Sequence, residues 1–389
     1  MGNMKLRLGM VGGGQGAFIG AVHRIAARMD NEYTLVCGVF SSDPQKSREM
    51  GLILDLKEER VYRTYQQLIE EESLLPVNER VQVISIVTPN HLHFDPARLA
   101  LENGFHVILD KPATFSLAEA LVLKTLCSRT GNRLCLTHTY TGYPMVKEAR
   151  QIVASGKLGR ITKIYAEYPQ GWLSRFEEGS GSNKQASWRT DPAKSGIAGA
   201  MGDIGTHAFN LMEYVSGLEV VKLCADINTV VQGRRLDDDG AVLLKFSNGA
   251  SGVLIATQIA TGEENNIKIR IYGEQGGLEW QQSDANTLKL MLTDQPAQML
   301  RTGGAYLSSF ATHNTRTPSG HPEGYLEAFA NLYRNFALTI KAHLANEDPS
   351  PELLDFPGIN EGVRGMAFIE NVIRSGKSEK KWSEFSLEI

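Results

Sequence analysis

The sequence predicts an α/β protein with a doubly wound parallel sheet at the N-terminus, followed by an α+β domain with a large, mostly antiparallel, open-faced sheet. Two patterns carry this prediction. Early in the 389-residue chain, apolar strands alternate with amphipathic helices, as in a parallel sheet covered on both faces. Later, alternating strands are joined by turns such as Ser247-Asn248-Gly249, which is typical of antiparallel hairpins. We expect one domain at 1–139 and a second domain at 140–389.

The first domain should contain strands and helices in regular alternation. Short apolar runs predict the strands, and apolar residues three or four positions apart predict the helices. Strands are expected at 5–11, 33–40, 81–87, 105–109 and 133–137, with a short strand running into a helix at 61–68, and helices at 19–29, 92–103 and 117–129. Gly104 suits the end of the second of these helices, because glycine adopts the left-handed backbone conformation found there.

The second domain should be dominated by one wide sheet. After a helix from Pro144, strands are expected at 161–167, 220–231, 239–246, 251–258, 267–272, 277–280 and 288–292. Helices at 324–340 and 362–375 and a surface strand at 380–389 follow, and the aromatic stripe of the first helix should be core. Helices should cover one face of the sheet, and a second subunit in a homodimer or homotetramer should cover the other.

Composition argues against several classes of partner. The net charge is −4, so the chain lacks the basic footprint of a nucleic-acid-binding protein. No apolar run approaches the length of a membrane span, and residues 1–8 lack the apolar core of a signal peptide. Cys37, Cys127, Cys135 and Cys224 have no metal-ligand spacing, and we expect them to be buried apolar residues. A cytoplasmic protein without nucleic-acid or membrane partners is expected.

A glycine-rich turn, Gly12-Gly13-Gly14-Gln15-Gly16, lies between the first strand and the first helix. Such a turn lets the backbone approach a pyrophosphate, which the N–H groups at a helix start also bind. Gly12 and Gly14 supply the first two glycines of a dinucleotide-binding fingerprint. The third position has two interpretations: Ala17 completes GxGxxA, or the loop carries a short insertion and Gly20 serves.

The end of the second strand bears on the choice between NAD and NADP. NAD sites usually place Asp or Glu there, whereas this chain has Ser41 and Ser42, with Asp43 next. Lys46 or Arg48 could attract the 2′-phosphate of NADP. Asp43 either turns inward toward the ribose or simply opens the next helix. The pattern favours NAD, with NADP as the alternative.

Polar residues follow two buried strands, in Thr88-Pro89-Asn90-His91-Leu92-His93 and in Asp110-Lys111-Pro112. In an open parallel sheet, ligands bind beyond the carboxyl ends of the strands. We therefore expect Lys111 to lie where a cofactor and a substrate meet.

Asp203 and His207 are four residues apart, so both side chains should lie on one face near the start of a helix. An imidazole can take a hydroxyl proton near neutral pH, and a carboxylate can orient it. A lysine ammonium facing them would stabilise the charge on the same oxygen. An Asp at a helix start can also be only a cap. A metal site would need a third ligand such as His138 or His321, which no spacing supports, and we expect no metal.

These motifs resemble the signature of the Gfo/Idh/MocA family, the NAD(P)-dependent relatives of glucose–fructose oxidoreductase and inositol dehydrogenase. The likeness rests on Thr88-Pro89-Asn90, His93, Ala97, Ala100-Leu101, Gly104, His106-Val107, Asp110-Lys111-Pro112, Gly202-Asp203 and His207. The family usually has Glu where this chain has Asp110. Within it the chain is most similar to sugar and cyclitol dehydrogenases, near levoglucosan and glucoside 3-dehydrogenases.

The resemblance implies an NAD(P)-binding Rossmann domain and a second domain for substrate binding and oligomerisation. It implies Lys111 and His207 as the polar pair at a reacting hydroxyl, and Asp203 as the supporting acid. The residues expected at the cofactor are Gly12, Gly14, Gln15, Ala17, Phe18, Ile19, Ser41, Ser42, Thr88, Pro89, Asn90, His93, Asp110 and Lys111.

Two long loops, at 169–196 and 297–321, should edge the substrate site. Aromatic faces stack on sugar rings, while Arg, Asn and His bind hydroxyls, so the composition of these loops suits a polyol. The predicted substrate contacts are Lys111, Tyr140, Trp188, Arg189, Asp203, His207 and His321.

The sequence therefore predicts an oxidoreductase that moves a hydride between nicotinamide and a secondary hydroxyl of a sugar, sugar derivative or cyclitol. Two alternatives stay open: an NAD-assisted glycosidase on the same fold, and a non-catalytic regulator that senses a dinucleotide. The presence of Lys111, Asp203 and His207 together argues against the regulator.

Overall fold

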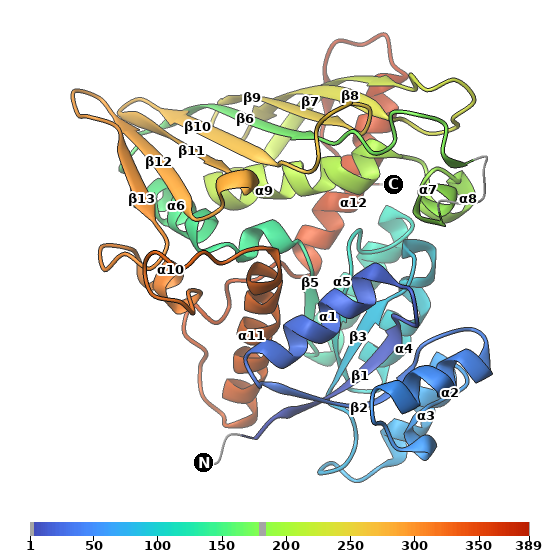
Figure 1. Cartoon of the computed structure of the whole chain (residues 1–389). Helices are drawn as coiled ribbons and strands as arrows, with labels where there is room; N and C mark the ends of the chain where they lie inside the picture. The colour runs from blue at the N-terminus through green and yellow to red at the C-terminus, as the bar shows by residue number, and fades with distance from the viewer. Residues whose placement is uncertain (1–3, 179–183, 389) are drawn as a thin grey trace. The chain divides into compact units, whose positions relative to one another are not determined.

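The chain separates into two compact units in the computed structural model, which describes residues 4–178 and 184–388 (Figure 1). The first unit comprises Met1–Gly142 and Tyr325–Val363, and the second comprises Tyr143–Gly324 and Arg364–Ile389. Among the described residues, no helix is both long and apolar enough to cross a membrane.

A five-stranded parallel sheet forms the centre of the first unit, with the strand order β2-β1-β3-β4-β5. The strands are β1 (Leu6–Gly12), β2 (Tyr33–Val39), β3 (Val83–Val87), β4 (His106–Leu109) and β5 (Leu134–Leu136). This confirms the predicted doubly wound sheet. The strands run in one direction, so the turns after β1, β3, β4 and β5 all lie at the carboxyl end of the sheet, which is called the sheet edge below.

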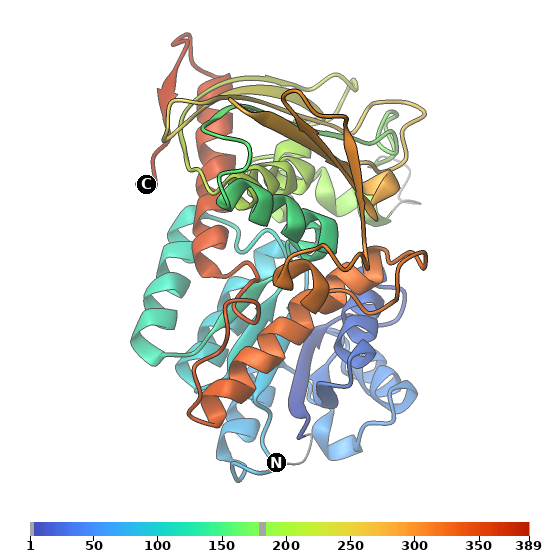
Figure 2. The same cartoon turned by 90° about the vertical axis from the view of Figure 1, so that its left-hand side faces the viewer.

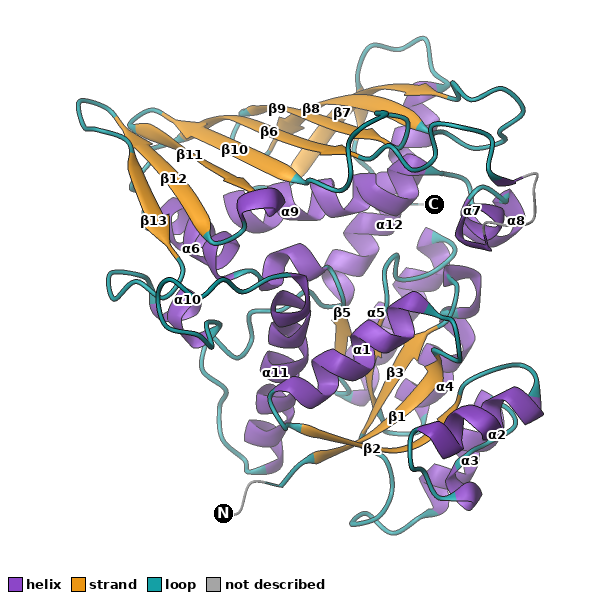
Figure 3. Cartoon of the chain, viewed as in Figure 1, coloured by secondary structure: helices purple, strands orange, loops and turns teal. Residues whose placement is uncertain are grey.

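Helices surround this sheet (Figure 3). They are α1 (Phe18–Met29), α2 (Pro44–Ile53), α3 (Tyr65–Leu74), α4 (Phe94–Glu102), α5 (Leu117–Thr130) and α11 (Tyr325–Leu344). Of the short strand running into a helix predicted at 61–68, the strand is reduced to an isolated bridge between Val61 and Gly38, and the helix is confirmed as α3, which begins at Tyr65. The helix starts there because the Thr64 side chain accepts a hydrogen bond from the Gln67 N–H.

The helix α11 packs against α1, although about three hundred residues separate them in the sequence (Figures 1 and 2). Its Phe329, Tyr333 and Phe336 are buried in the same core cluster as Leu6 and Leu8 of β1. The aromatic stripe is therefore core, as predicted. The second compact unit differs from the expected domain at 140–389, because this stripe buries its apolar surface in the first unit.

A nine-stranded sheet dominates the second unit, with the order β13-β12-β11-β10-β6-β9-β8-β7-β14. Neighbouring strands are antiparallel except β6 and β9, which pair in parallel. The strands are β6 (Ile161–Pro169), β7 (Val220–Asn228), β8 (Asp239–Phe246), β9 (Ser251–Thr257), β10 (Lys268–Gly273), β11 (Gly276–Gln281), β12 (Thr287–Leu292), β13 (Gln298–Arg301) and β14 (Ser383–Glu384). This confirms the large, mostly antiparallel sheet.

Helices α6 (Pro144–Ala154) and α9 (Thr206–Ser216) cover one face of the nine-stranded sheet (Figure 1). The boundary between the two units falls within α12 (Ile359–Gly376). Of the four cysteines, Cys37 and Cys135 are buried as predicted, whereas Cys127 and Cys224 are partly exposed.

The two segments expected to be long loops contain further elements. The first holds α7 (Lys184–Arg189) and α8 (Pro192–Ser195), and its residues 179–183 lie outside the described residues. The second holds β13 and α10 (Ser309–His313). Capping explains the short helices, because the Asp191 and Ser308 side chains accept hydrogen bonds from backbone N–H groups of α8 and α10.

Candidate active site

The glycine turn after β1 has a backbone that suits glycine alone. The φ angles of Gly12, Gly13 and Gly16 are +91°, +74° and +77°, in the left-handed region. A Cβ atom on Gly14 would lie 2.5 Å from the carbonyl oxygen of Phe40 at the end of β2. The turn therefore offers bare backbone beside a helix start, which fits the pyrophosphate of a dinucleotide.

Gly20 has the close packing expected of the third glycine in the second of the two interpretations. A Cβ atom on Gly20 would lie 2.3 Å from Cα of Gly13, so α1 packs directly on the turn at this residue. Ala17 is instead the N-cap residue of α1. The Arg24 guanidinium, one turn further on, donates a hydrogen bond to the Gly13 carbonyl at 2.6 Å and holds the turn against the helix.

Asp43 opens the next helix, as in the second of its two interpretations. Its carboxylate accepts hydrogen bonds from the backbone N–H groups of Gln45 (2.9 Å) and Lys46 (3.4 Å) at the start of α2. The Ser41 hydroxyl oxygen in turn accepts from the Asp43 N–H at 3.1 Å. The charged end of Arg48 lies 3.6 Å from Glu58.

The other residues predicted at the cofactor lie at the same sheet edge. Gln15 and Phe18 are exposed beside the glycine turn, and Ile19 is half-buried. Thr88, Pro89 and Asn90 form the turn after β3. Side chains from the turns after β1 and β3 therefore line this end of the parallel sheet.

His93 is buried and joins two of these turns. One ring nitrogen lies 2.8 Å from the Thr88 carbonyl oxygen, and the other lies 2.9 Å from the Pro112 carbonyl oxygen. Burial lowers the pKa of His93, against the opposing influence of Asp110. The ring therefore links the turn after β3 to the turn that carries Lys111.

Lys111 follows β4 and is half-buried beside an ionised carboxylate. One oxygen of Asp110 accepts hydrogen bonds from the Lys111 N–H and the Thr137 hydroxyl, both at 2.9 Å, which fixes the turn. Burial alone would raise the pKa of Asp110, but His23, whose Nε2 lies 3.9 Å away, and Lys111 hold it well below its usual range. Burial and the charge of Lys111 lower the pKa of His138 to about 3, so this imidazole is neutral.

Two further residues lie near this edge, of which one was predicted as a substrate contact and the other was not predicted. Tyr140, predicted as a substrate contact, is only 4% exposed in the 3-10 turn Thr139–Gly142. His23 was not predicted at all; its Nδ1 lies 2.7 Å from the Tyr333 hydroxyl, which lies 2.8 Å from the hydroxyl of Ser85. The buried polar network beneath Lys111 thus includes α11, whose return to this sheet the sequence did not reveal.

In the second unit, Asp203 lies in a π-helical turn, Met201–Gly205, which leads directly into α9, so it lies near the start of a helix as predicted. His207 follows as the second residue of α9. The buried carboxylate of Asp237 anchors this start by accepting hydrogen bonds from the N–H groups of Gly199 (2.6 Å) and Met201 (2.7 Å). Such wide turns occur frequently at functional sites, because they re-aim one side chain.

The structure brings several predicted residues together around Asp203. Its carboxylate lies 3.4 Å from Nε of Arg189, whose guanidinium stacks 4.4 Å from the ring centre of Trp188. His207 is 9% exposed, and its ring centre lies 6.3 Å from that of Tyr168. His321 is exposed, and among the described residues no hydrogen bond, ion pair or ring contact joins it to this group.

Gln258 is a neighbour of Asp203 that the sequence analysis missed. Its side-chain amide donates a hydrogen bond to the Asp203 carboxylate at 2.9 Å. Gln258 directly follows β9, and the only signal in the sequence was a polar residue at the end of the strand predicted at 251–258. Nothing in the linear sequence showed that this strand end lies beside the helix carrying Asp203.

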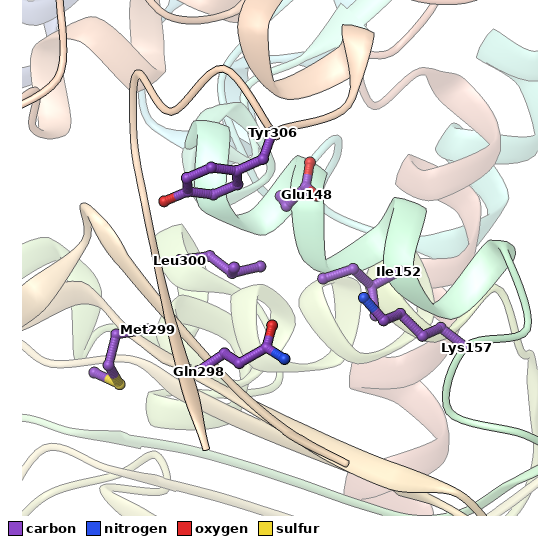
Figure 4. A pocket seen from close by; sticks show the side chains of 7 residues that line it. All are labelled: Glu148, Ile152, Lys157, Gln298, Met299, Leu300 and Tyr306. Atoms are coloured by element: carbon purple, nitrogen blue, oxygen red, sulfur yellow. The ribbon is translucent and has the colours of Figure 1, made fainter. Parts of the chain in front are cut away.

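A cavity of about 410 Å³ in the second unit lies between α6 and β13 (Figure 4). Its lining residues are Glu148, Ile152, Lys157, Gln298, Met299, Leu300 and Tyr306. The Glu148 carboxylate already accepts hydrogen bonds from the N–H and hydroxyl of Ser308. These described lining residues include none of the predicted site residues.

Both units match models of known protein families. The chain matches the model of the oxidoreductase family with an NAD-binding Rossmann fold over residues 6–138, and that of the GFO/IDH/MocA C-terminal domain over residues 146–279. The uncharacterised oxidoreductase YfiI of Bacillus subtilis is 33% identical, over 98% of this chain and 97% of its own length.

Solved structures are similar over the same span. An oxidoreductase from Sinorhizobium meliloti is 42% identical, with a TM-score of 0.87 over 98% of this chain and 99% of its own. An inositol dehydrogenase homologue from Azotobacter vinelandii, complexed with NADH and myo-inositol, is 32% identical, with a TM-score of 0.89 over 98% of each chain. The chain therefore belongs to the GFO/IDH/MocA family of oxidoreductases with an NAD-binding Rossmann fold.

Proposed function

We propose that this protein is a dehydrogenase that transfers hydride between NAD and a secondary hydroxyl of a cyclitol or sugar. The observation that carries the proposal is the set of functional groups that the two units present. The first offers a glycine cradle with the Lys111 ammonium at the same sheet edge, and the second offers the Asp203 carboxylate and the His207 imidazole on successive helical turns.

In this proposal Lys111 and His207 act on one substrate hydroxyl. His207 takes the hydroxyl proton as general base, and Asp203 orients the imidazole and stabilises its charged form. The Lys111 ammonium donates a hydrogen bond to the same oxygen and stabilises its developing negative charge. NAD, when bound along the turns after β1 and β3, supplies the hydride acceptor.

The proposed substrate class follows from the groups around Asp203. The Trp188 ring offers an apolar face to a sugar or cyclitol ring, and Arg189 offers donors to its hydroxyls. The complex of the Azotobacter vinelandii homologue with myo-inositol supports a cyclitol. Tyr140 and His321 remain predicted contacts of the same substrate.

We also propose NAD over NADP, a cytoplasmic location and a homo-oligomer. The NADH in the complex of the Azotobacter vinelandii homologue supports NAD. The outer face of the nine-stranded sheet exposes Leu243 (45%) and Ile255 (39%) on adjacent strands, and a second copy would bury them. Sedimentation of the purified protein measures the assembly directly.

A substrate screen with both cofactors tests the function. We expect nicotinamide absorbance to rise with NAD and a cyclitol or sugar, in proportion to the ketone formed. Product formation without NADH accumulation would establish the NAD-assisted glycosidase instead. Tight NAD binding without turnover of any cyclitol, sugar or glycoside would establish the dinucleotide-sensing regulator.

A further inference from the structure

A chain of side-chain amides runs from Asp203 along the ends of two neighbouring strands. Gln170 follows β6 and Gln258 follows β9, and the two strands pair in parallel, so their ends lie at one edge. The Gln258 amide donates to Asp203 at 2.9 Å and also lies 3.3 Å from the side-chain oxygen of Gln170. That oxygen accepts a further hydrogen bond from the indole N–H of Trp172 at 2.9 Å.

The far end of this chain is anchored by Asn265, and the indole N–H of Trp172, which can only donate, sets the orientation of the Gln170 amide. The Gln170 NH₂ group donates to the side-chain oxygen of Asn265, which also accepts from the Tyr168 hydroxyl at 2.7 Å. The Asn265 NH₂ group donates to Gln282 at 3.0 Å. Because Gln170 must turn its oxygen toward Gln258, the Gln258 amide must turn its N–H groups toward Gln170 and Asp203.

Burial distinguishes Gln258 from Arg189, the charged partner of Asp203. Gln258 is 2% exposed, whereas the side chain of Arg189 is 26% exposed. Arg189 faces the Asp203 carboxylate from α7, His207 follows on α9, and the Tyr168 ring packs beside His207 from β6. A buried neutral donor to a carboxylate both limits its rotation and favours its ionised form.

We propose that Gln258 is a positioning residue of the dehydrogenase, which holds the Asp203 carboxylate oriented and ionised so that it can support His207. This inference rests on the proposed function, in which Asp203 is the supporting acid. Gln170 acts through Gln258, since it fixes the direction of the amide. The ionisation of Asp203 then depends on a hydrogen bond from a residue outside the helix that carries it.

The direct test is the titration of Asp203 in isosteric variants. Protein labelled with ¹³C at the aspartate carboxyl carbon gives one signal per aspartate, and Asp203→Asn identifies that of Asp203. Gln258→Met removes the hydrogen-bond donor and changes the side-chain volume little. It should raise the midpoint of the Asp203 titration by about one pH unit. Gln258→Glu places a second carboxylate at the same spot and should raise it further.

Gln295→Glu is the matched control, because this exposed glutamine in the turn between β12 and β13 gains the same charge. It should leave the Asp203 midpoint unchanged. NAD affinity and thermal unfolding, measured on all variants, identify any variant that fails to fold. The inference is overturned if a folded Gln258 variant titrates at Asp203 as the parent protein does.

Kinetics separate this inference from the function on which it rests. With the substrate found in the screen, the acid limb of the kcat/KM profile should move to higher pH in the order parent, Gln258→Met, Gln258→Glu. A shifted carboxyl titration in a protein that oxidises no polyol would contradict the proposed function, while the effect of Gln258 on the ionisation of Asp203 would stand. An unshifted titration in an active dehydrogenase would contradict the role of Gln258 and leave the proposed function standing.

Discussion

At the scale of the residue, burial decides the charge of the histidines at the strand ends of the first unit. Burial lowers the pKa of His93, and of His138 to about 3. The cation that acts at this edge is therefore Lys111, while the imidazoles nearby serve as neutral hydrogen-bonding groups. An Asp110 carboxylate that stays ionised complements the ammonium next to it.

The depressed pKa of His138 predicts a specific loss of stability in acid. An unfolded histidine binds a proton below about pH 6.5, whereas His138 in the folded protein resists protonation down to about pH 3. Its contribution is therefore complete above pH 6.5 and is lost as the pH falls from 6.5 toward 3. Between pH 7.5 and 5, His138 alone should lower the free energy of unfolding by about 2 kcal/mol.

Urea unfolding at these two pH values measures the effect. From pH 7.5 to pH 5, the free energy of unfolding of His138→Asn should fall by about 2 kcal/mol less than that of the parent protein, whatever the stability of the variant at pH 7.5. The exposed His321→Asn is the control and should keep the full dependence. An equal loss in the parent and His138→Asn would show that His138 is protonated in the folded state.

At the scale of the element, the contact between α1 and the glycine turn shapes the proposed cofactor site. Gly20→Ala would place a methyl group 2.3 Å from the Gly13 backbone, so either the helix or the turn must shift. We expect the dissociation constant for NAD to rise at least tenfold, since the turn and the helix start form one anion site. Isothermal titration calorimetry of the variant measures this.

Gly365→Ala is the matched control for that substitution. Gly365 also lies in a helix, but nothing stands within 4 Å of its added Cβ. Alanine is the better helix former by about 1 kcal/mol, so this variant should be slightly more stable and bind NAD normally. Unchanged NAD affinity in Gly20→Ala would show that the turn tolerates displacement of α1.

The elements also show how far the sequence could be interpreted. The strands and the turns with Gly12 and Lys111 were predictable because apolar runs and their polar ends are local features. The contribution of α11 to the first unit was not, since no local pattern records which sheet an aromatic stripe covers. The π-helical turn at Asp203 and the place of Gln258 depend on Asp237 and on the parallel pairing of β6 with β9, which are contacts between distant residues.

At the scale of the whole molecule, the proposed catalytic groups are divided between the two units. Lys111 belongs to the first unit, and Asp203 and His207 belong to the second. Each unit supports its own part: Asp110 and His93 fix the turn that carries Lys111, while Asp237 and Gln258 fix the helix start that carries Asp203. The proposed function requires both parts to act on one hydroxyl.

A double-mutant cycle on hydride transfer tests this requirement most directly. Lys111→Met and His207→Gln should each lower kcat by about 10²–10⁴-fold with the substrate found in the screen, the usual share of a proton-handling group. Because both would act on the same oxygen, the double variant should be little slower than the slower single variant. Losses that multiply in the double variant, or a single variant with the parent's turnover, would contradict a shared site.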